Sequence, residues 1–190
     1  MKYIGNCADS INWYALIEQL KGNPGLILGR PNEIFNEDLS SVDPRPEHSY
    51  MHGKLLNAGY HTTDSIEWIN YFSNKDFDST FADQFADYVN CKEVVVWVSS
   101  IRPGKCIPWH WDFDYGERDQ QVQENKSNIL RFICHIGDPS PGQIFCLEDE
   151  ITANEPNGSI YQWEDIDAWH GGINIGLKQK YLFNFLGIPK

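Results

Sequence analysis

From Lys92 onward the sequence consists of short runs with β-strand character, separated by turn signals. The run 94–98 is rich in Val and is typical of a buried strand. Further candidates are 107–113, 129–136, 144–147, 159–163 and 181–186. The turn signals are Pro103-Gly104, the Pro-rich segment 138–142 and Asn157-Gly158. Short strands at this spacing, with no helical pattern between them, predict a β-sandwich or jelly-roll barrel over 92–190.

The first 91 residues show a different sequence pattern, in which helical segments alternate with loops. A first helix is expected to follow Asp9 or Ser10 and to end at Gly22. Its apolar face would be Trp13, Leu16, Ile17 and Leu20. The other expected elements are a short strand at 26–28, a loop over 30–63, a helix from Asp64 to about Phe72, and a helix that begins at Ser79 or Thr80. We therefore expect one domain, 1–190, in which 1–91 form a helix- and loop-rich cover on the barrel core 92–190.

The charge balance narrows the range of partners. The chain carries 27 acidic and 15 basic residues, a net charge of −12, which disfavours nucleic acid and anionic membrane surfaces. No apolar run reaches the roughly 18 residues of a membrane span, and the first residues lack the apolar core of a secretory signal. The five cysteines are scattered, without a Cys-x-x-Cys pair, and we expect reduced thiols in a cytoplasmic protein.

The chemistry is concentrated in Pro-Trp-His-Trp-Asp, residues 108–112. On a strand, side chains alternate between faces, so His110 and Asp112 would point the same way. His170, before two glycines, is the best third ligand from a distant strand. Two histidines and one carboxylate form the facial triad of non-heme Fe(II) oxygenases, which leaves positions open for a co-substrate and O₂.

A 2-oxoglutarate-dependent enzyme of this kind also needs a cation for the far carboxylate of the co-substrate. Lys180 stands ten residues after His170, at the start of an otherwise apolar strand. A lysine in such a place is costly unless it is exposed or paired. Lys178 is the alternative cation.

Several ordered motifs across 93–187 resemble the aspartyl/asparaginyl β-hydroxylase-like proteins. The segment 100–104, Ser-Ile-Arg-Pro-Gly, resembles the lead-in to the first metal histidine of that family, and 158–165 resembles the glycine-led strand before the second. Asn174 stands four residues after His170, where the family has Asn or Gln. The chain departs from the family by carrying Asp112 and by having Lys180 where Arg is usual.

The resemblance implies a double-stranded β-helix that binds Fe(II) and 2-oxoglutarate and hydroxylates a substrate with O₂, releasing succinate and CO₂. Lys180 would then pair with the far carboxylate, with a hydrogen bond from the Ser100 hydroxyl. Arg131 would lie near the metal-bound end of the co-substrate, and Asn174 would belong to the same cofactor site.

Two other interpretations remain open at this point. A cupin of another class, such as an isomerase, a different dioxygenase or a sugar-binding module, would also hold a metal, although Asp112 replaces the second histidine of the usual cupin motif. A non-catalytic β module would use its histidines structurally. The substrate could be an amino acid, a protein side chain or a small acid, and the polar loop 114–128 is our candidate for its selection. The remaining histidines of the first 91 residues, His48, His52 and His61, are expected on the surface.

Overall fold

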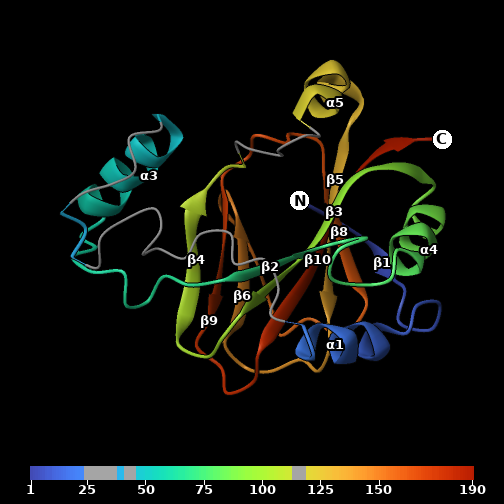
Figure 1. Cartoon of the computed structure of the whole chain (residues 1–190), viewed down its shortest axis with the longest axis horizontal. Helices are drawn as coiled ribbons and strands as arrows, with labels where there is room; N and C mark the ends of the chain where they lie inside the picture. The colour runs from blue at the N-terminus through green and yellow to red at the C-terminus, as the bar shows by residue number, and fades with distance from the viewer. Residues whose placement is uncertain (24–37, 41–45, 113–118) are drawn as a thin grey trace.

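The computed structural model describes residues 1–23, 38–40, 46–112 and 119–190, in which two antiparallel sheets face each other (Figure 1). The larger sheet is formed, in order, by β1 (Lys2–Asn6), β8 (Ser159–Trp163), β5 (Leu130–Ile136), β10 (Lys180–Pro189), β3 (Cys91–Ile101) and β2 (Ile69–Phe72). The smaller is formed by β4 (Lys105–His110), β9 (His170–Asn174), β6 (Gln143–Leu147) and β7 (Glu150–Ala153). The helices are α1 (Trp13–Lys21), α3 (Pro46–Asn57), α4 (Thr80–Tyr88) and α5 (Asp119–Glu124), with a 3₁₀ turn, η2 (Lys126–Asn128).

From β3 to β10 the chain passes back and forth between the sheets. Strands β3, β5, β8 and β10 belong to the larger sheet, and β4, β6, β7 and β9 to the smaller one. This winding is the double-stranded β-helix, so the predicted fold class, a mainly β jelly-roll with N-terminal helices, is confirmed. The sequence patterns missed β7 and β9, because β7 has four residues and β9 contains two glycines, which have low strand propensity.

The larger sheet buries both of its faces. Inside the barrel, Leu182 packs with side chains from both sheets, among them Ile133, Phe145 and Trp163. On the outer face, Phe183 contacts α1 and α4: its ring centroid lies 5.0 Å from that of Trp13 and 5.1 Å from that of Phe85. Because neighbouring residues of a strand point to opposite faces, the alternation along β10 separates the barrel interior from the helix-covered side.

Two of the predicted helices are confirmed. The helix α1 buries the predicted apolar face and ends before Gly22, but its N-cap is Asn12, whose side chain accepts a hydrogen bond from the amide of Ala15. Asp9 and Ser10 instead lie in a turn before the helix. The helix α4 follows Ser79, as expected.

Other predictions for the first 91 residues are wrong. Residues 46–57 form α3 rather than a loop, because Pro46 takes the first helical position, where the missing amide hydrogen costs nothing. The end of the proposed helix 64–72 is strand β2. The N-terminal part therefore supplies both edge strands of the larger sheet, β1 and β2. The strand predicted at 26–28 lies outside the described residues, and no helix in the described part of the chain is long and apolar enough to cross a membrane.

Candidate metal centre and anion site

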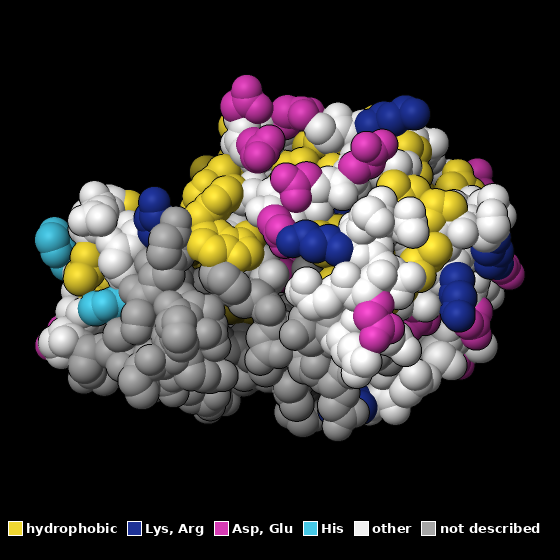
Figure 2. Space-filling view, turned by 90° about the horizontal axis from the view of Figure 1, so that it is seen from above, with side chains coloured by type: hydrophobic (Ala, Val, Ile, Leu, Met, Phe, Trp, Pro, Cys, Tyr) yellow, Lys and Arg dark blue, Asp and Glu magenta, His cyan; other side chains and the backbone are white. Residues whose placement is uncertain are grey.

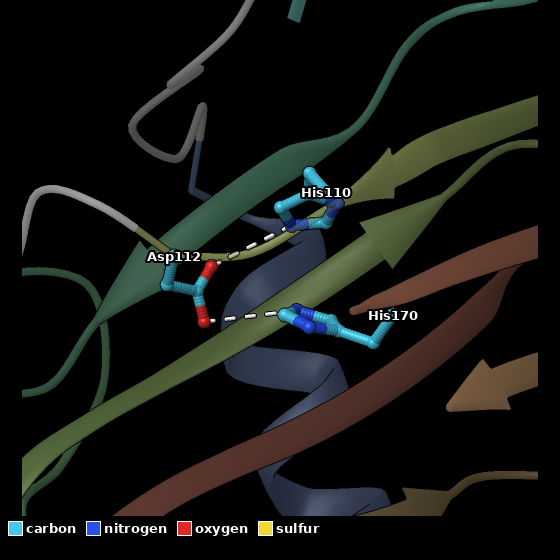
Figure 3. Close-up of side chains that lie close together, drawn as sticks. All are labelled: His110, Asp112 and His170. Carbon is cyan, nitrogen blue, oxygen red and sulfur yellow. Dashed lines mark ion pairs between the residues drawn. The ribbon is translucent and has the colours of Figure 1, made fainter. Parts of the chain in front are cut away.

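The structure brings His110, Asp112 and His170 together, with their ligand atoms all within 4.8 Å of one another (Figure 3). Nε2 of His110 lies 3.5 Å from Oδ1 of Asp112, and Nε2 of His170 lies 3.6 Å from Oδ2. Two ligands about 2.1 Å from a shared ion lie roughly 3 to 4 Å apart. The three side chains therefore converge as the ligands of one metal ion do.

Strand pairing accounts for this convergence. His110 is the last residue of β4 and His170 the first of β9, and they are directly paired. Their ring centroids are 4.4 Å apart. Asp112 lies two residues beyond the end of β4, so the expectation that it sits on the strand is wrong. Its carboxylate nevertheless reaches the same side as the imidazoles.

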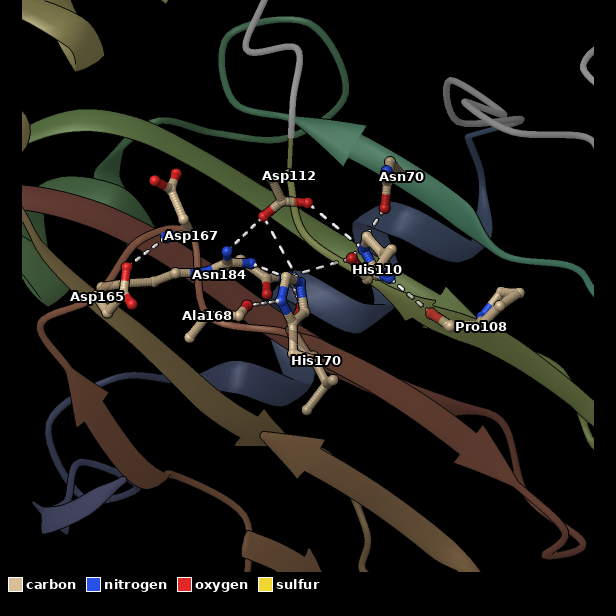
Figure 4. Close-up of polar contacts among 12 residues, drawn as sticks. Asn70, Pro108, His110, Asp112, Asp165, Asp167, Ala168, His170 and Asn184 are labelled. Atoms are coloured by element: carbon tan, nitrogen blue, oxygen red, sulfur yellow. Dashed lines mark hydrogen bonds and ion pairs between the residues drawn. The ribbon is translucent and has the colours of Figure 1, made fainter. Parts of the chain in front are cut away.

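Both imidazoles are held in the tautomer that a metal requires. Nδ1 of His110 lies 2.7 Å from the carbonyl oxygen of Pro108, and Nδ1 of His170 lies 2.9 Å from that of Ala168 (Figure 4). A carbonyl can only accept, so each Nδ1 carries a hydrogen, and in the neutral ring the lone pair is then on Nε2. This backbone support is typical of metal-binding histidines.

Arg131 contacts two members of the cluster, Asp112 and His170. Its Nη1 lies 2.5 Å from Oδ2 of Asp112 and its Nη2 lies 3.1 Å from Nε2 of His170. The guanidinium is almost fully buried between the rings of Trp97 and Trp163, whose centroids are 5.4 and 5.0 Å from Cζ. Arg131 therefore lies directly against the cluster of His110, Asp112 and His170.

The charges of the cluster explain its protonation. Burial opposes ionisation of Asp112, but the charge of the Arg131 guanidinium is the main opposing cause, and the pKa of that carboxyl lies well below its usual range. Burial, with the Arg131 charge as the next cause, holds the pKa of His170 well below its usual range. The centre therefore presents an anionic carboxylate and a neutral His170, the forms that bind metal.

Lys180 lies inside the barrel. It is 1% exposed, its Nζ donates to the carbonyl oxygen of Ile144, and it lies 6.0 Å from the centroid of the Phe145 ring. No carboxylate pairs with it among the described residues. Burial lowers the pKa of Lys180 to about 7. Burying the charged form of such an amine without an anionic partner is costly.

Lys178, two residues earlier, is outside the barrel. Its Nζ lies 3.1 Å from Oδ2 of Asp138, and both side chains are more than half exposed. Of the two lysines considered from the sequence, the geometry favours Lys180 as the interior cation.

A buried polar pair that the sequence patterns missed accompanies Lys180. Nε2 of His135 lies 3.1 Å from Oγ1 of Thr152, and both residues are buried. Burial, and then the Lys180 charge, lowers the pKa of His135 to about 3, so the ring is neutral. The alternation of side chains along β5 places His135 on the same face as Arg131, so the sequence pattern could have identified His135 as an interior residue. No sequence pattern pointed to Thr152, because the strand β7 that carries it was not predicted.

Two predicted cofactor contacts are corrected. Ser100 pairs with Tyr181, so it lies on the helix-covered face, opposite to Lys180, and its Oγ accepts from Gln179. Asn174 is inside the barrel, but its amide is fully used by the backbone. Nδ2 donates to the carbonyls of Ile101 and Lys178, and Oδ1 accepts from Gly176. Asn174 therefore braces the turn before β10.

A second missed group lines the interior beside the metal ligands. Nδ2 of Asn184 donates to Oγ of Ser99 at 3.1 Å, and that hydroxyl donates to Oδ1 of Asn70 at 2.8 Å (Figure 4). Ser99, rather than Ser100, is thus the β3 serine that faces the barrel interior. Asn70 comes from β2, so the N-terminal part of the chain contributes to the interior as well as covering it.

Several tryptophans lie around the end of the barrel where His110, Asp112 and His170 meet. The Trp68 ring is nearly parallel to that of His110 at 6.5 Å, and the Trp111 and Trp169 rings are in edge contact at 4.3 Å. Trp109 is 42% exposed. Figure 2, which looks onto the side where β4 ends, shows apolar side chains gathered beside acidic ones.

The remaining candidates lie elsewhere or are only partly described. His52 bonds to the carbonyl of Leu39 at 2.7 Å and does not join the triad, and of the His48 side chain nothing is described. His61 is exposed. Of the proposed substrate-selecting loop 114–128, residues 114–118 lie outside the described residues, and the following helix is anchored by the fully buried Val122.

No family model matches the sequence, and no curated protein matches it. Solved structures with a similar fold include the viral collagen prolyl hydroxylase vCPH from Paramecium Bursaria Chlorella virus-1, at 12% identity and a TM-score of 0.47, with 75% of this chain and 89% of that chain covered. A 2OG-Fe(II) oxygenase family oxidoreductase from Burkholderia pseudomallei is 10% identical, with 92% and 77% covered and a TM-score of 0.42. A predicted oxalate decarboxylase from Thermotoga maritima is 8% identical, with 64% and 81% covered and a TM-score of 0.38. At these identities the likeness extends to the barrel fold alone.

Proposed function

We propose that the chain is a non-heme Fe(II)- and 2-oxoglutarate-dependent oxygenase that hydroxylates an organic substrate and releases succinate and CO₂. One observation carries the proposal. The same barrel holds a cluster of two histidines and one carboxylate, and a buried lysine, Lys180, for which the described residues provide no carboxylate. A metal site alone would not require that lysine, whereas a co-substrate with a second carboxylate would.

The residues of the cluster fit a metal ion. Although Nη1 of Arg131 lies close to Oδ2 of Asp112, neither atom has a well-aligned hydrogen bond, and Nε of Arg131 also lacks a partner. Buried polar atoms without partners are rare in native proteins. His110, Asp112 and His170 would hold Fe(II), and the Arg131 donor that now faces His170 would be released toward a neighbouring anion.

The surroundings of Lys180 fit one end of a dicarboxylate. Gly172 of β9 faces the amine: a Cβ at this position would lie 2.9 Å from Cδ1 of Ile101 and 3.5 Å from Nζ of Lys180. A side chain here would fill the space in front of the lysine. Lys180 would donate to the far carboxylate of 2-oxoglutarate, and the Thr152 hydroxyl lies beside His135 as a further donor.

The chain's own groups would bind, orient and exclude water. Bound Fe(II) and 2-oxoglutarate supply the oxidising chemistry. The carbonyls of Pro108 and Ala168 hold the two imidazoles in the metal-binding tautomer. Arg131 would neutralise negative charge at one end of the co-substrate and Lys180 at the other. The tryptophans near β4 would contact an apolar part of the substrate.

Succinate formation tests the proposal. The purified chain, given Fe(II), 2-oxoglutarate and O₂ with a panel of amino acids and peptides, should release succinate. His110→Ala and His170→Ala should abolish this release and metal binding, whereas His52→Ala, a histidine outside the cluster, should retain both. If metal binds through His110 and His170 but no 2-oxoglutarate binds or turns over, the chain is a metal-dependent barrel of another class and the proposal fails.

A further inference from the structure

Two cysteines that are 127 residues apart in the sequence meet on the helix-covered side of the larger sheet. Sγ of Cys7 lies 3.8 Å from Sγ of Cys134, and both residues are fully buried. Cys7 directly follows the edge strand β1, and Cys134 is in the middle of β5. Among the described residues, the other three cysteines, Cys91, Cys106 and Cys146, share no sulfur–sulfur contact with this pair.

The backbone fixes this meeting. The amide of Cys7 donates to the carbonyl of Gly158 at 3.0 Å, and the amide of Gly158 donates to the carbonyl of His135 at 2.7 Å. Gly158 has a φ of +84°, and a Cβ there would lie 2.5 Å from the amide nitrogen of Ala8. Only glycine allows this close approach. The two sulfurs are therefore held together by hydrogen-bonded backbone on both sides.

We propose that Cys7 and Cys134 form a redox pair that a two-electron thiol oxidant converts to an intramolecular disulfide, which ties the end of β1 to β5. A disulfide bond is about 2.05 Å long, so the sulfurs must approach by roughly 1.8 Å. The proposal requires that rotation of the two side chains supply this movement, with the strand register unchanged.

The two thiols have different roles in the reaction. A hydrogen bond from Cys134 lowers the pKa of Cys7, whereas burial raises the pKa of Cys134 well above its usual value. The Cys7 sulfur attacks the oxidant, and the Cys134 sulfur then attacks Cys7. With diamide, a sulfur–nitrogen bond forms and then breaks as the sulfur–sulfur bond forms. The two thiols lose two electrons and two protons, and the diazene becomes a hydrazine.

The position of the pair explains how an oxidant enters and what the disulfide does. Among the described strands, β1 is at the edge of its sheet and pairs with β8 alone, so local opening of this strand would expose Cys7. Cys134 points away from the barrel interior, because Arg131, Ile133 and His135 take the opposite face of β5. The disulfide would therefore link the end of β1 to β5 on the outer face of the sheet. It would leave the barrel interior, where the proposed metal site lies, unchanged.

The test is diamide treatment of the full-length chain under native conditions. We expect a mass loss of about 2 Da, one thiol pair missing after unfolding, and a rise in Tm of about 5–15 °C that dithiothreitol reverses. Digestion at acidic residues should give a Cys7–Cys134 linked peptide, because Asp138 separates Cys134 from Cys146.

A variant that retains only Cys7 and Cys134 gives a test that does not depend on whether the variants lacking one of these two cysteines fold. The triple variant Cys91→Ala, Cys106→Ala, Cys146→Ala should still lose both of its thiols. Cys7→Ala and Cys134→Ala should each prevent the intramolecular cross-link. The proposal is overturned if the triple variant keeps two free thiols after oxidation, or if the linked peptide in the wild-type chain joins another pair.

Discussion

Nη1 of Arg131 lies 2.5 Å from Oδ2 of Asp112, inside a cage formed by the rings of Trp97 and Trp163. The carboxylate that we assign to the metal is therefore already balanced by a buried cation. Arg131 also donates toward the lone pair of His170. A metal ion bound at the proposed site would therefore compete with Arg131 for these two side chains, and the strength of its binding would depend on this arginine.

Replacing Arg131 with Met should separate its effect on the stability of the metal-free chain from its effect on metal binding. The metal-free variant should lose stability on the order of 3 kcal/mol, because Asp112 keeps a buried charge without a partner. Saturating Mn(II) should raise the Tm of the variant more than that of the wild type. Arg102→Met is the control, because Arg102 forms an exposed ion pair with Glu67 and should change stability by less than about 1 kcal/mol. Equal Mn(II) shifts in Arg131→Met and wild type would contradict the competition.

Lys180→Met should have opposite effects on stability and on co-substrate binding. The ligand-free variant should be at least as stable as the wild type, since it no longer buries an unpaired amine. Its apparent Kd for 2-oxoglutarate should rise at least about 30-fold, because losing one partner of a buried charge pair costs on the order of 2–5 kcal/mol. Calorimetry with Mn(II) in place of Fe(II) measures this. Lys178→Met should bind normally; a loss at Lys178 instead would reassign the cation.

The lowered pKa of Lys180, about 7, predicts a pH dependence. The ammonium form binds a carboxylate, and in the ligand-free chain it is lost as the pH rises through 7. Between pH 6.5 and 8.5 the apparent Kd for 2-oxoglutarate should rise roughly twentyfold, with proton uptake on binding. His135 and Cys146 are the titratable groups near this amine. His135 is neutral above about pH 3, and burial raises the thiol pKa of Cys146.

Linkage gives the corresponding effect on stability. The unfolded chain keeps the Lys180 proton up to its ordinary pKa of 10.5, whereas the folded chain loses it near 7. The contribution of Lys180 to folding stability should therefore become more favourable between pH 7 and 10.5. The difference in free energy of unfolding between wild type and Lys180→Met, measured in urea across this range, checks the sign. A difference that does not vary with pH would contradict the shifted pKa.

Residues 1–91 and 92–190 should not fold separately. The N-terminal part supplies both edge strands of the larger sheet, and its helices bury the aromatic outer face around Phe183. Expressed alone, 1–91 should be unfolded and 92–190 poorly soluble, as measured by circular dichroism and sedimentation. A cooperatively folded 1–91 fragment would show that it is an independent domain.

The sequence by itself determined the class of fold and the three candidate ligands. Strand runs between turn signals predicted the barrel, and the His110-x-Asp112 motif with His170 predicted a cluster that the structure brings together. These features are local: a period of two and a turn residue act over a few positions.

The tertiary structure decided which face of each strand is inside. The larger sheet is buried on both faces, so apolar residues occupy both parities of β3 and β10, and the sequence pattern could not separate Ser99 from Ser100. The pairing of His135 with Thr152 was missed for a different reason: it joins two strands from different sheets, and one of them, β7, was not predicted. Lys180 and Lys178 have the same parity, and only the position where β10 begins places one in the interior and the other in solvent. Burial depends on what packs against a strand from distant parts of the chain, and this information is absent from the strand itself.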